Sequence, residues 1–448
     1  MWRRNKKNII QPGPGPAATS DSTVTCVEEL KTASFCRMQN VDIDFTRMVR
    51  TGISRAFKPG FIQTFGEFTN SSSKGSPPPK WAPYDIDGKI HRGTGTRPVF
   101  KTDEHACDIM ETRPTFVMSN DDIYNIGHYM NDVMAVWAAS VLAETNTKQA
   151  VLLNIDGVRR RGPAGLASHR LMNTSNPDEH GPYRGYYDSW FQEQQRGVQY
   201  SNSKVCFKEV YFQALPGIAW FWGDWGLVTP CSIEAPSPLY QSFALFLRRR
   251  WIEDHGRESL PDPDTDKVHV VIELRSINLK KSIAKQSSSR HIRNHEALKK
   301  RLEKNPKLRV TVQDFAKLPF EEQVALSHSA GVFVSMHGAG TTHIYHMALG
   351  KQNCCGLVEL FPDKTIEFHA AQGYGNLARH LGLHHTRYVS PQHATTVDGT
   401  NVDVEEVAIK IEQVAEKVRV KPSCLHDVRD TRDPIATKSK SNWLPWDV

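Results

Sequence analysis

A strand, an HGAG turn, a helix and a second strand follow one another in this chain and constrain its fold more than any other feature. Val332–Met336 is a short β-prone run, typical of a buried parallel strand, and His337–Gly340 follows it directly. We expect Thr341–Leu349 to form the helix and Gly356–Phe361 to form the second strand, which carries Glu359. A small-residue turn before a helix N-terminus presents backbone N–H groups to an anion. The sequence predicts a βαβ unit that cradles a nucleotide or sugar phosphate; the alternative is a tight crossover without a ligand.

Strands and helices alternate at short spacing on both sides of this unit. The expected strands are residues 268–274, 308–312 and 385–389, and the expected helices are residues 294–304, 320–330 and 376–381. A last amphipathic helix is indicated by an apolar stripe at Val404, Val407, Ile411, Val414 and Val418. This alternation predicts a doubly wound parallel sheet, that is, a Rossmann-like domain.

A polar stripe lies on a predicted helix in the first half of the chain. Thr115–Met118 is expected as a strand, and a long helix is expected over residues 123–144. Asn125, His128 and Asp132 are spaced i, i+3 and i+7 on it, so they share one face. An amide, an imidazole and a carboxylate at the mouth of a cleft suit general-base chemistry. The alternative is a solvated helix face.

Length and composition indicate two domains with a tail at each end. A chain of 448 residues is long for one domain, and Asp262–Lys267 reads as an interdomain linker. Further expected elements are strands 150–155 and 205–212 and a helix over Pro238–His255. We therefore expect a Pro- and Gly-rich tail over residues 1–25, an N-terminal domain over 26–262, a C-terminal domain over 263–420 and a tail over 421–448.

Arginines are predicted at the ligand-binding edge of the C-terminal sheet. Arg275 follows strand 268–274 directly, and a Lys- and Ser-rich loop then leads to Arg290 and Asn294. Guanidinium groups placed there would bind a diphosphate through paired hydrogen bonds. The alternative is a solvated basic loop.

Charge, hydropathy and cysteine spacing weigh against several classes of protein. The formal charge is +7, with 56 basic and 49 acidic residues interspersed, which favours an anionic small molecule over nucleic acid as a partner. Neither an 18-residue apolar stretch nor a signal peptide is readable. The eight cysteines show no CxxC spacing, and Cys206 and Cys231 are candidates for a disulfide in an oxidising compartment.

Four motifs together resemble glycosyltransferase family 61. They are Asn-x-x-His-x-x-x-Asp on the helix, an Arg followed by Arg-x-Ile-x-Asn, HGAG-x-Thr, and the later Val-Glu-Leu-Phe-Pro. The family includes extracellular O-linked GlcNAc transferases, the protein O-mannose GlcNAc transferase and plant xylan xylosyl- and arabinosyltransferases. The resemblance covers residues 115–390 and is densest over 275–362.

The resemblance implies an α/β enzyme of GT-B-like architecture, with two Rossmann-like domains facing a cleft. It implies inverting transfer of GlcNAc or a pentose from a UDP-sugar to a hydroxyl of a protein or polysaccharide acceptor, without a metal or other cofactor, in the Golgi or endoplasmic reticulum lumen. Asp132 would be the catalytic base, with His128 as its orienter or substitute and Asn125 beside them. The implied nucleotide-sugar-binding residues are Arg275, Arg290, Asn294, His337, Gly338, Ala339, Gly340, Thr341, Thr342 and Glu359.

The chain departs from the family pattern at three points. Thr341 stands where the family usually has Leu, and so does Arg293. No N-terminal anchor is readable, so membrane association is expected only if an anchor segment is missing from this chain. Three alternatives to the transferase remain: a non-catalytic carbohydrate- or nucleotide-binding protein that retains the fold, a metalloenzyme using His337, His343 and His346, and a nucleic-acid-binding module.

Overall fold

The chain divides into two compact units, Met1–Trp220 and Phe221–Val448. The structure is a computed structural model. It describes residues 23–29, 33–44, 48–50, 55–57, 62–65, 69–70, 99–101, 107–118, 126–154, 193–196, 203–212, 236–260, 266–275, 290–348, 355–362, 373–391, 394–396 and 398–418.

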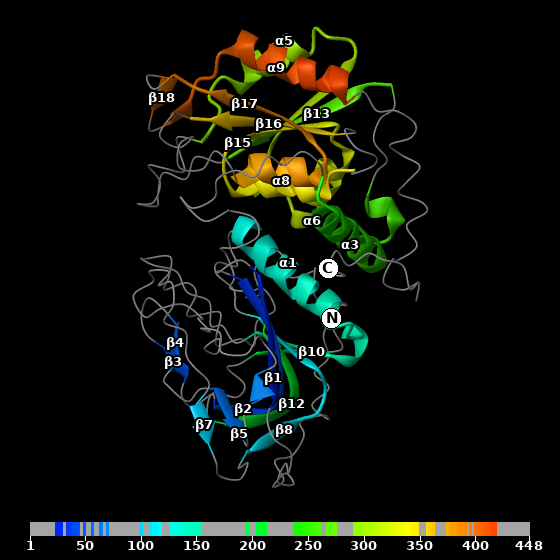
Figure 1. Ribbon diagram of the computed structural model, residues 1–448. Coiled ribbons are helices and arrows are strands. Elements are labelled where there is room, and N and C mark those ends of the chain that lie inside the picture. The colour runs from blue at the N-terminus through cyan, green and yellow to red at the C-terminus, as the bar shows by residue number, and fades with distance from the viewer. Residues whose placement is uncertain are drawn as a thin grey trace. The chain divides into compact units, whose positions relative to one another are not determined.

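The first unit is built on a mixed ten-stranded sheet (Figure 1). Its elements are β1 (Thr23–Glu29), β2 (Ala33–Asp44), β3 (Met48–Arg50), β4 (Arg55–Phe57), β5 (Ile62–Phe65), β6 (Thr69–Asn70), β7 (Val99–Lys101), β8 (Ile109–Glu111), β9 (Thr115–Met118), α1 (Ile126–Leu142), η3 (Thr147–Gln149), β10 (Val151–Asn154), β11 (Glu193–Arg196) and β12 (Lys204–Phe212). The main strand order is β11-β10-β9-β12-β2-β1-β6, and β3 and β4 form a separate hairpin.

Only part of this sheet matches the Rossmann-like domain that we expected. Strands β11, β10, β9 and β12 are parallel neighbours, whereas β2 pairs antiparallel with both β12 and β1. The antiparallel pairing of β1 with β2 follows from the short connection between them, because a few residues can join antiparallel strands but not parallel ones. Strand β1 also begins inside the segment 1–25 that we expected to be a tail.

A disulfide links the two ends of the region that contains α1. Cys107, just before β8, is bonded to Cys206 in β12, with a Cα–Cα distance of 5.6 Å. The pairing of Cys206 with Cys231 that we considered is therefore wrong. Strands β8 and β12 are adjacent and parallel, which brings Cys107 close to Cys206.

The second unit contains a five-stranded parallel sheet in the order β14-β13-β15-β16-β17. Its elements are α3 (Pro238–His255), η7 (Arg257–Ser259), β13 (Val268–Leu274), α5 (His295–Leu302), β14 (Leu308–Asp314), η8 (Phe315–Lys317), α6 (Phe320–Ser329), β15 (Val332–Met336), η9 (Ala339–His346), β16 (Gly356–Phe361), α8 (Gly373–Leu381), β17 (His384–Val389), β18 (Thr395–Thr396), β19 (Gly399–Thr400) and α9 (Val404–Lys417). The predicted doubly wound sheet is confirmed.

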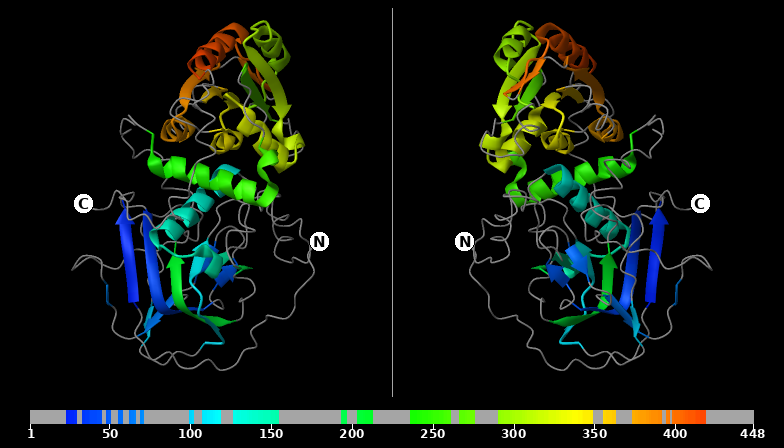
Figure 2. Two further views of the ribbon diagram at one scale, coloured as in Figure 1. Left: turned by 90° about the vertical axis from the view of Figure 1, so that its right-hand side faces the viewer. Right: turned by 90° about the vertical axis from the view of Figure 1, so that its left-hand side faces the viewer.

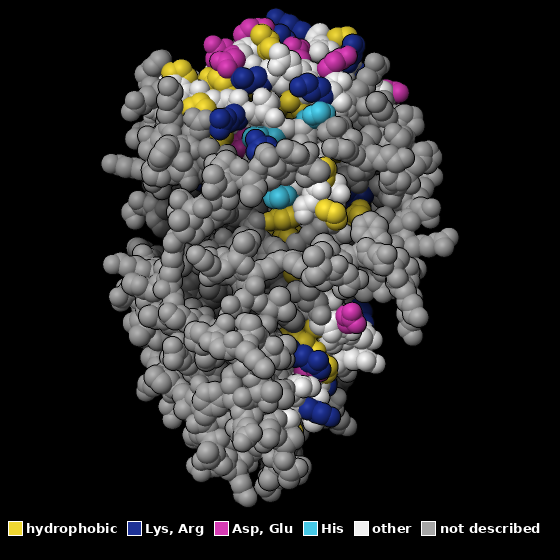
Figure 3. Space-filling view, in the orientation of Figure 1, with side chains coloured by type: hydrophobic (Ala, Val, Ile, Leu, Met, Phe, Trp, Pro, Cys, Tyr) yellow, Lys and Arg dark blue, Asp and Glu magenta, His cyan; other side chains and the backbone are white. Residues whose placement is uncertain are grey.

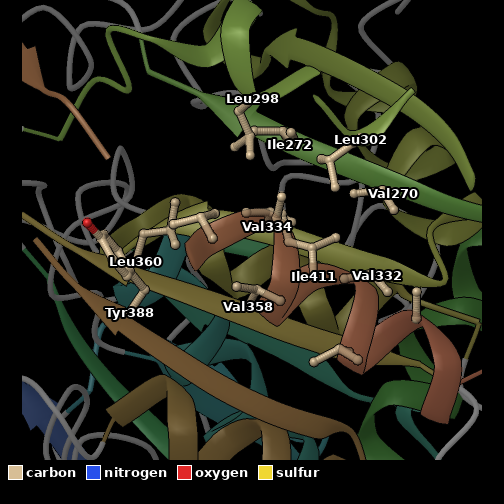
Figure 4. Close-up of a cluster of buried hydrophobic side chains, with 14 of the residues drawn as sticks. Val270, Ile272, Leu298, Leu302, Val332, Val334, Val358, Leu360, Tyr388 and Ile411 are labelled. Carbon is tan, nitrogen blue, oxygen red and sulfur yellow. The ribbon is translucent and has the colours of Figure 1, made fainter. Parts of the chain in front are cut away.

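The core of this unit lies on one face of the sheet. Even-numbered strand residues pack against α5 and α9, which lie side by side over that face (Figures 1 and 2). Figure 4 shows this apolar cluster, which includes Ile272, Val334, Val358 and Ile411. The odd-numbered residues point to the opposite face, which α6, α8 and η9 cover. Since even positions supply the core, the odd positions are where polar side chains can gather.

Local sequence explains why α9 forms beside α5. Asp403 caps its N-terminus by accepting a hydrogen bond from the Glu406 backbone N–H at 2.9 Å. Val407, Ile411 and Val414 are buried along one side. The outer surface of this helix pair carries charges of both signs close together, as Figure 3 shows for this end of the unit.

Helix α3 belongs to the second unit, although we expected the domain boundary at 262/263. The ring of Tyr240 stacks on His380 of α8 with centroids 4.4 Å apart. The Arg248 guanidinium donates a 3.1 Å hydrogen bond to the carbonyl of Met347. These contacts tie α3 to α8 and to the end of η9, so the division falls at 220/221. The expected linker Asp262–Lys267 lies mostly outside the described residues.

Candidate active site

The site lies where the strand order of the second sheet reverses. Strand β13 is followed in sequence by β14 on one side, whereas β15, β16 and β17 are added on the other. Ligands of doubly wound sheets bind at such a switch point, outside the carboxyl ends of the strands. Arg275 follows β13 and His337 follows β15, so one residue comes from each of the two strands that flank the reversal.

Two guanidinium groups converge on the glycine of the HGAG turn. A Cβ placed on Gly338 would lie 2.6 Å from Nη1 of Arg275 and 2.8 Å from Nη1 of Arg290. Gly338 has φ 153° and ψ −173°, a backbone conformation that is essentially restricted to glycine. A side chain at this position would therefore strain the turn and displace both arginines.

These arginines lack acceptors for part of their hydrogen-bonding capacity. Nη1 of Arg275 and Nε of Arg290 are buried and have no hydrogen-bond partner among the described residues. Burial, and then the like charge of Arg275, lower the pKa of Arg290, while Tyr374 opposes that shift. Buried donors that repel each other and lack acceptors are stabilised by a bound anion. This is the arrangement expected of a diphosphate site.

Glu359 holds the histidine of the turn in place. Its Oε1 is 2.6 Å from Nδ1 of His337, and its Oε2 is 3.0 Å from Nε2 of His385 on β17. Burial would raise the pKa of Glu359, but the hydrogen bonds from the two imidazoles outweigh it and lower the pKa. The His337 ring also stacks on Phe361 with centroids 4.9 Å apart. Glu359 is therefore an ionised carboxylate that fixes His337.

A second buried carboxylate supports the other end of the turn. Glu273 accepts a hydrogen bond from the Ser335 hydroxyl, whose oxygen is 3.1 Å from Oγ1 of Thr341. The Glu273 carboxylate lies so close to Gly340 that a Cβ there would collide with it. Burial raises the pKa of Glu273, although Arg275 and the Ser335 hydroxyl oppose the shift. Glu273, Ser335 and Glu359 are in register across β13, β15 and β16.

Tyr374 on α8 faces the same turn. Its hydroxyl accepts a 3.4 Å hydrogen bond from Thr342, and its ring meets His337 edge to face, with centroids 5.3 Å apart. Burial raises the pKa of Tyr374, so its hydroxyl stays protonated. Thr341 and Thr342 are fully buried, whereas Ala339 is half-buried at the tip of the turn. The segment after the turn forms η9, a 3-10 helix over Ala339–His346, rather than the helix over 341–349 that we expected.

Asn294 joins two segments of the second unit through its side-chain amide. Its amide donates a 2.7 Å hydrogen bond to the carbonyl of Val402 and accepts one at 3.0 Å from the Val402 N–H. These two bonds join the start of α5 to the segment that precedes α9. The expected role of Asn294 in binding the nucleotide sugar stays a prediction.

The polar stripe of the first unit is only partly described. Asn125 lies outside the described residues. His128 and Asp132 lie on α1, four residues apart and therefore on one helix face, as the spacing predicted. The predictions that concern their side chains stay predictions.

The geometry does not favour a metal site at the histidines of η9. His343 meets the ring of Phe315 edge to face at 5.0 Å, and His346 meets Phe320 edge to face at 6.2 Å. Burial lowers the pKa of His343 to about 3, so this ring is neutral and packs as an aromatic group. Within the described ranges, no group of three His, Cys, Asp or Glu residues is arranged to hold a metal ion.

Sequence reasoning missed four residues of the site: Glu273, Ser335, Tyr374 and His385. Each carries a signal that is visible afterwards. Ser335 interrupts an apolar strand, and Glu273 stands next to the last residue of another. Their odd-numbered positions place them on the face of Glu359, but this follows only from the strand register, which no local pattern gives.

Comparisons with known proteins identify the family of the chain. The profile of the family described as glycosyltransferase 61 matches residues 126–354, about half of the chain. The chain belongs to this family, which confirms the resemblance. The match runs from the start of α1 through β13 and the HGAG turn, so it includes both arginines.

The curated relatives are EGF domain-specific O-linked N-acetylglucosamine transferases. The Gallus gallus protein is 25% identical over 402 residues, which cover 85% of this chain and 64% of the relative. The Mus musculus protein is 23% identical over 454 residues, covering 94% and 75%. The Drosophila melanogaster protein is 22% identical over 343 residues, covering 75% and 59%. The chain thus spans less than two thirds of the length of some of these relatives.

In the parts of the chain that the structure describes, no helix is long and apolar enough to cross a bilayer.

Proposed function

We propose that this protein is an inverting glycosyltransferase that moves a sugar from a UDP-sugar to a hydroxyl of a protein or glycan acceptor. The observation that carries the proposal is the pair of buried guanidinium groups at Gly338, each with one nitrogen that has no hydrogen-bond partner among the described residues. They lie at the switch point of a parallel sheet, in a member of a glycosyltransferase family. The names of the relatives favour GlcNAc as the sugar and a protein as the acceptor.

In the proposed reaction the acceptor oxygen attacks the anomeric carbon from the face opposite the diphosphate. The bond between that carbon and the diphosphate oxygen breaks, and the electron pair leaves with UDP. A base takes the proton of the acceptor hydroxyl, and we assign this role to Asp132 on α1, with His128 beside it. Arg275, Arg290 and the turn at Gly338 stabilise the charge of the departing diphosphate. We expect this step to need no metal, because the two arginines supply the positive charge.

The architecture and the compartment are parts of the same proposal. In a GT-B arrangement the first unit would supply the base and the acceptor side, and the second unit would bind the donor. The disulfide between Cys107 and Cys206 supports folding in an oxidising compartment, such as the lumen of the endoplasmic reticulum or the Golgi.

The test measures donor binding and turnover separately. Purified protein is titrated with UDP and with UDP-GlcNAc, UDP-xylose and UDP-arabinose in the presence and absence of EDTA. We expect binding that survives EDTA and falls about 10- to 100-fold in Arg275→Ala, because a charge-assisted hydrogen bond is worth about 1.5–3 kcal/mol. Arg293→Ala is the matched control, since it removes an exposed arginine three residues from Arg290.

Transfer or donor hydrolysis decides between the proposed enzyme and a binding protein. Turnover of one UDP-sugar, reduced in Asp132→Asn, supports the transferase. Nucleotide binding without any turnover on protein and glycan acceptors would favour a non-catalytic protein that retains the fold. An absence of nucleotide binding would remove the proposal altogether.

A further inference from the structure

The carboxylate of Glu359 is shared between two imidazole rings from different elements. His337 follows β15 and bonds Oε1, whereas His385 lies on β17 and bonds Oε2. Glu359 itself is completely buried, and the side chains of His337 and His385 are 5% and 8% exposed. Each carboxylate oxygen therefore has its own N–H donor, so the carboxylate cannot rotate without losing a bond.

Helix α8 has a glycine where the His385 ring lies against it. The ring of His385 packs against Gly375 of α8, where an added Cβ would lie 2.8 Å from Cε1 of the ring. The neighbouring residue Tyr374 meets His337 edge to face. Helix α8 therefore contacts both histidines: Gly375 packs against His385, and Tyr374 packs against His337.

Folding alone does not account for this buried polar group. On the opposite face of β15 and β16 the side chains are apolar, such as Val334, Val358 and Leu360. A buried ion pair can often be replaced by apolar residues of similar volume without loss of stability. The polar arrangement is confined to the face that carries the HGAG turn, which points to a role in the site.

The second nitrogen of His337 is left available. Among the described residues, the ring forms a hydrogen bond through Nδ1 to Glu359, and its other polar atom is Nε2. His337 also precedes Gly338 directly, and the guanidinium groups of Arg275 and Arg290 lie against that glycine. A diphosphate bound by the arginines would therefore come within the neighbourhood of the His337 ring.

We propose that His385 is a positioning residue that acts through Glu359 to hold the His337 ring, with Nε2 presented to the diphosphate of the donor. This inference rests on the proposed function. His385 does not touch the donor itself; it fixes the carboxylate, and the carboxylate fixes the imidazole that does. Outer hydrogen-bond partners orient histidines in this way at other sites.

The experiment compares two substitutions of the same residue. His385→Leu removes the N–H donor to Oε2, whereas His385→Gln keeps an N–H donor of similar reach. We expect His385→Leu to lower kcat/KM for the preferred UDP-sugar, or the affinity for UDP, about 10-fold or more, because a hydrogen bond to a charged group is lost. His385→Gln should recover most of that loss.

His269→Leu is the matched control. His269 is a buried imidazole on β13 that is hydrogen-bonded to Ser329 and Thr311. It lies near the opposite end of the strand from Arg275. Its loss should reduce the urea midpoint while leaving UDP affinity and kcat/KM within about twofold of the wild type.

A spectroscopic measurement separates positioning from stability. In protein labelled with 15N-histidine, the ring signals of His337, assigned with His337→Gln, should shift on addition of UDP in the wild type and in His385→Gln. They should not reach the same bound position in His385→Leu. Equal UDP response and equal kcat/KM in His385→Leu and His385→Gln would overturn this inference and leave the proposed function standing. A wild-type protein that binds no UDP would overturn both.

Discussion

Glu273 and Glu359 occupy equivalent places in one sheet but have opposite electrostatic behaviour. Both are buried, and both are in register with Ser335, which lies between them on β15. Burial raises the pKa of Glu273. Arg275 and the Ser335 hydroxyl oppose this shift only in part, so the pKa stays raised. Burial acts in the same direction on Glu359, yet two imidazole donors leave its pKa lowered. Burial alone does not decide the state of a carboxylate; the number and kind of its donors do.

The difference gives the two carboxylates different tasks. Glu359 has an N–H donor on each oxygen, so its charge is satisfied within the protein. Glu273 has one hydroxyl donor, and its negative charge acts on Arg275 and lies against Gly340. We infer that Glu359 holds a fixed group, whereas Glu273 balances part of the positive charge at the site before the diphosphate binds.

The largest expected effect comes from making each carboxylate an amide. Glu359→Gln removes the charge and places an NH2 group opposite one of the two imidazole N–H donors, so it should lower the free energy of unfolding by about 2–4 kcal/mol. Glu273→Gln should change it by no more than about 1 kcal/mol, because the amide removes a charge that burial disfavours. Urea unfolding of both variants at neutral pH measures the contrast. Equal losses would show that the two carboxylates are equivalent.

The pH dependence of stability should separate the two carboxylates in non-overlapping windows. The folded pKa of Glu359 is below its ordinary value of 4.5, so its stabilising contribution is complete above that pH and is lost as the pH falls below it. The folded pKa of Glu273 is above 4.5, so the buried ionised carboxylate lowers the stability of the protein at high pH. This loss of stability is relieved as the pH falls through the folded pKa towards 4.5.

Each window is read by comparing a variant with the wild type as the pH falls. The free energy of unfolding of Glu359→Gln should stay below that of the wild type by a constant amount down to about pH 4.5, and the difference should then shrink. Glu273→Gln avoids the penalty for a buried charge that the wild type has at high pH. This gain in the free energy of unfolding should disappear earlier as the pH falls, above pH 4.5. The slope of each change cannot exceed about 1.4 kcal/mol per pH unit for one proton. A common window for both variants would contradict the opposite shifts.

A smaller effect than that of Glu359→Gln is expected at Ser335, which lies between the two carboxylates. Ser335→Ala removes the hydroxyl that bonds Glu273 and contacts Thr341, but no bond to Glu359. It should reduce the free energy of unfolding by about 1 kcal/mol. It should also raise the pKa of Glu273 further, which a repeat of the pH series would detect. Thr396→Ala, a hydroxyl deletion on β18, serves as the control for loss of a hydroxyl elsewhere in the unit.

Much of the second unit could be predicted because its signals are local. The bounds of β13, β15, β16 and α3 match the expected ranges to the residue. Each is an apolar run, or a Pro-led amphipathic helix, that ends at a turn. Ligands of parallel sheets bind outside the carboxyl ends of the strands, and this rule depends only on where the strands end. It therefore predicted that Arg275, His337 and Glu359 belong to one site.

The remaining features depend on contacts distant in sequence. Strand β2 pairs with β12, and its mixed sequence ASFCRMQNVDID shows no apolar run that would reveal it. His385 reaches Glu359 only because β17 adds beside β16. The 3-10 geometry of η9 was missed for a related reason. Its i→i+3 bonds, such as the 2.9 Å bond from the Thr341 N–H to the Gly338 carbonyl, begin in a turn against which Arg275, Arg290 and Glu273 pack.

The bond between Cys107 and Cys206 has a consequence for the cohesion of the chain. It closes a covalent ring across 99 residues, and α1, β9 and β10 all lie inside that ring. Closing a ring of this size removes unfolded-state entropy worth about 4–5 kcal/mol. The one cysteine described in the second unit, Cys355, is a free buried thiol. Helix α1, to which we assign the acceptor side, therefore lies within a covalent ring that a reductant opens. The described core of the sheet in the second unit is instead held by packing that a reductant does not affect.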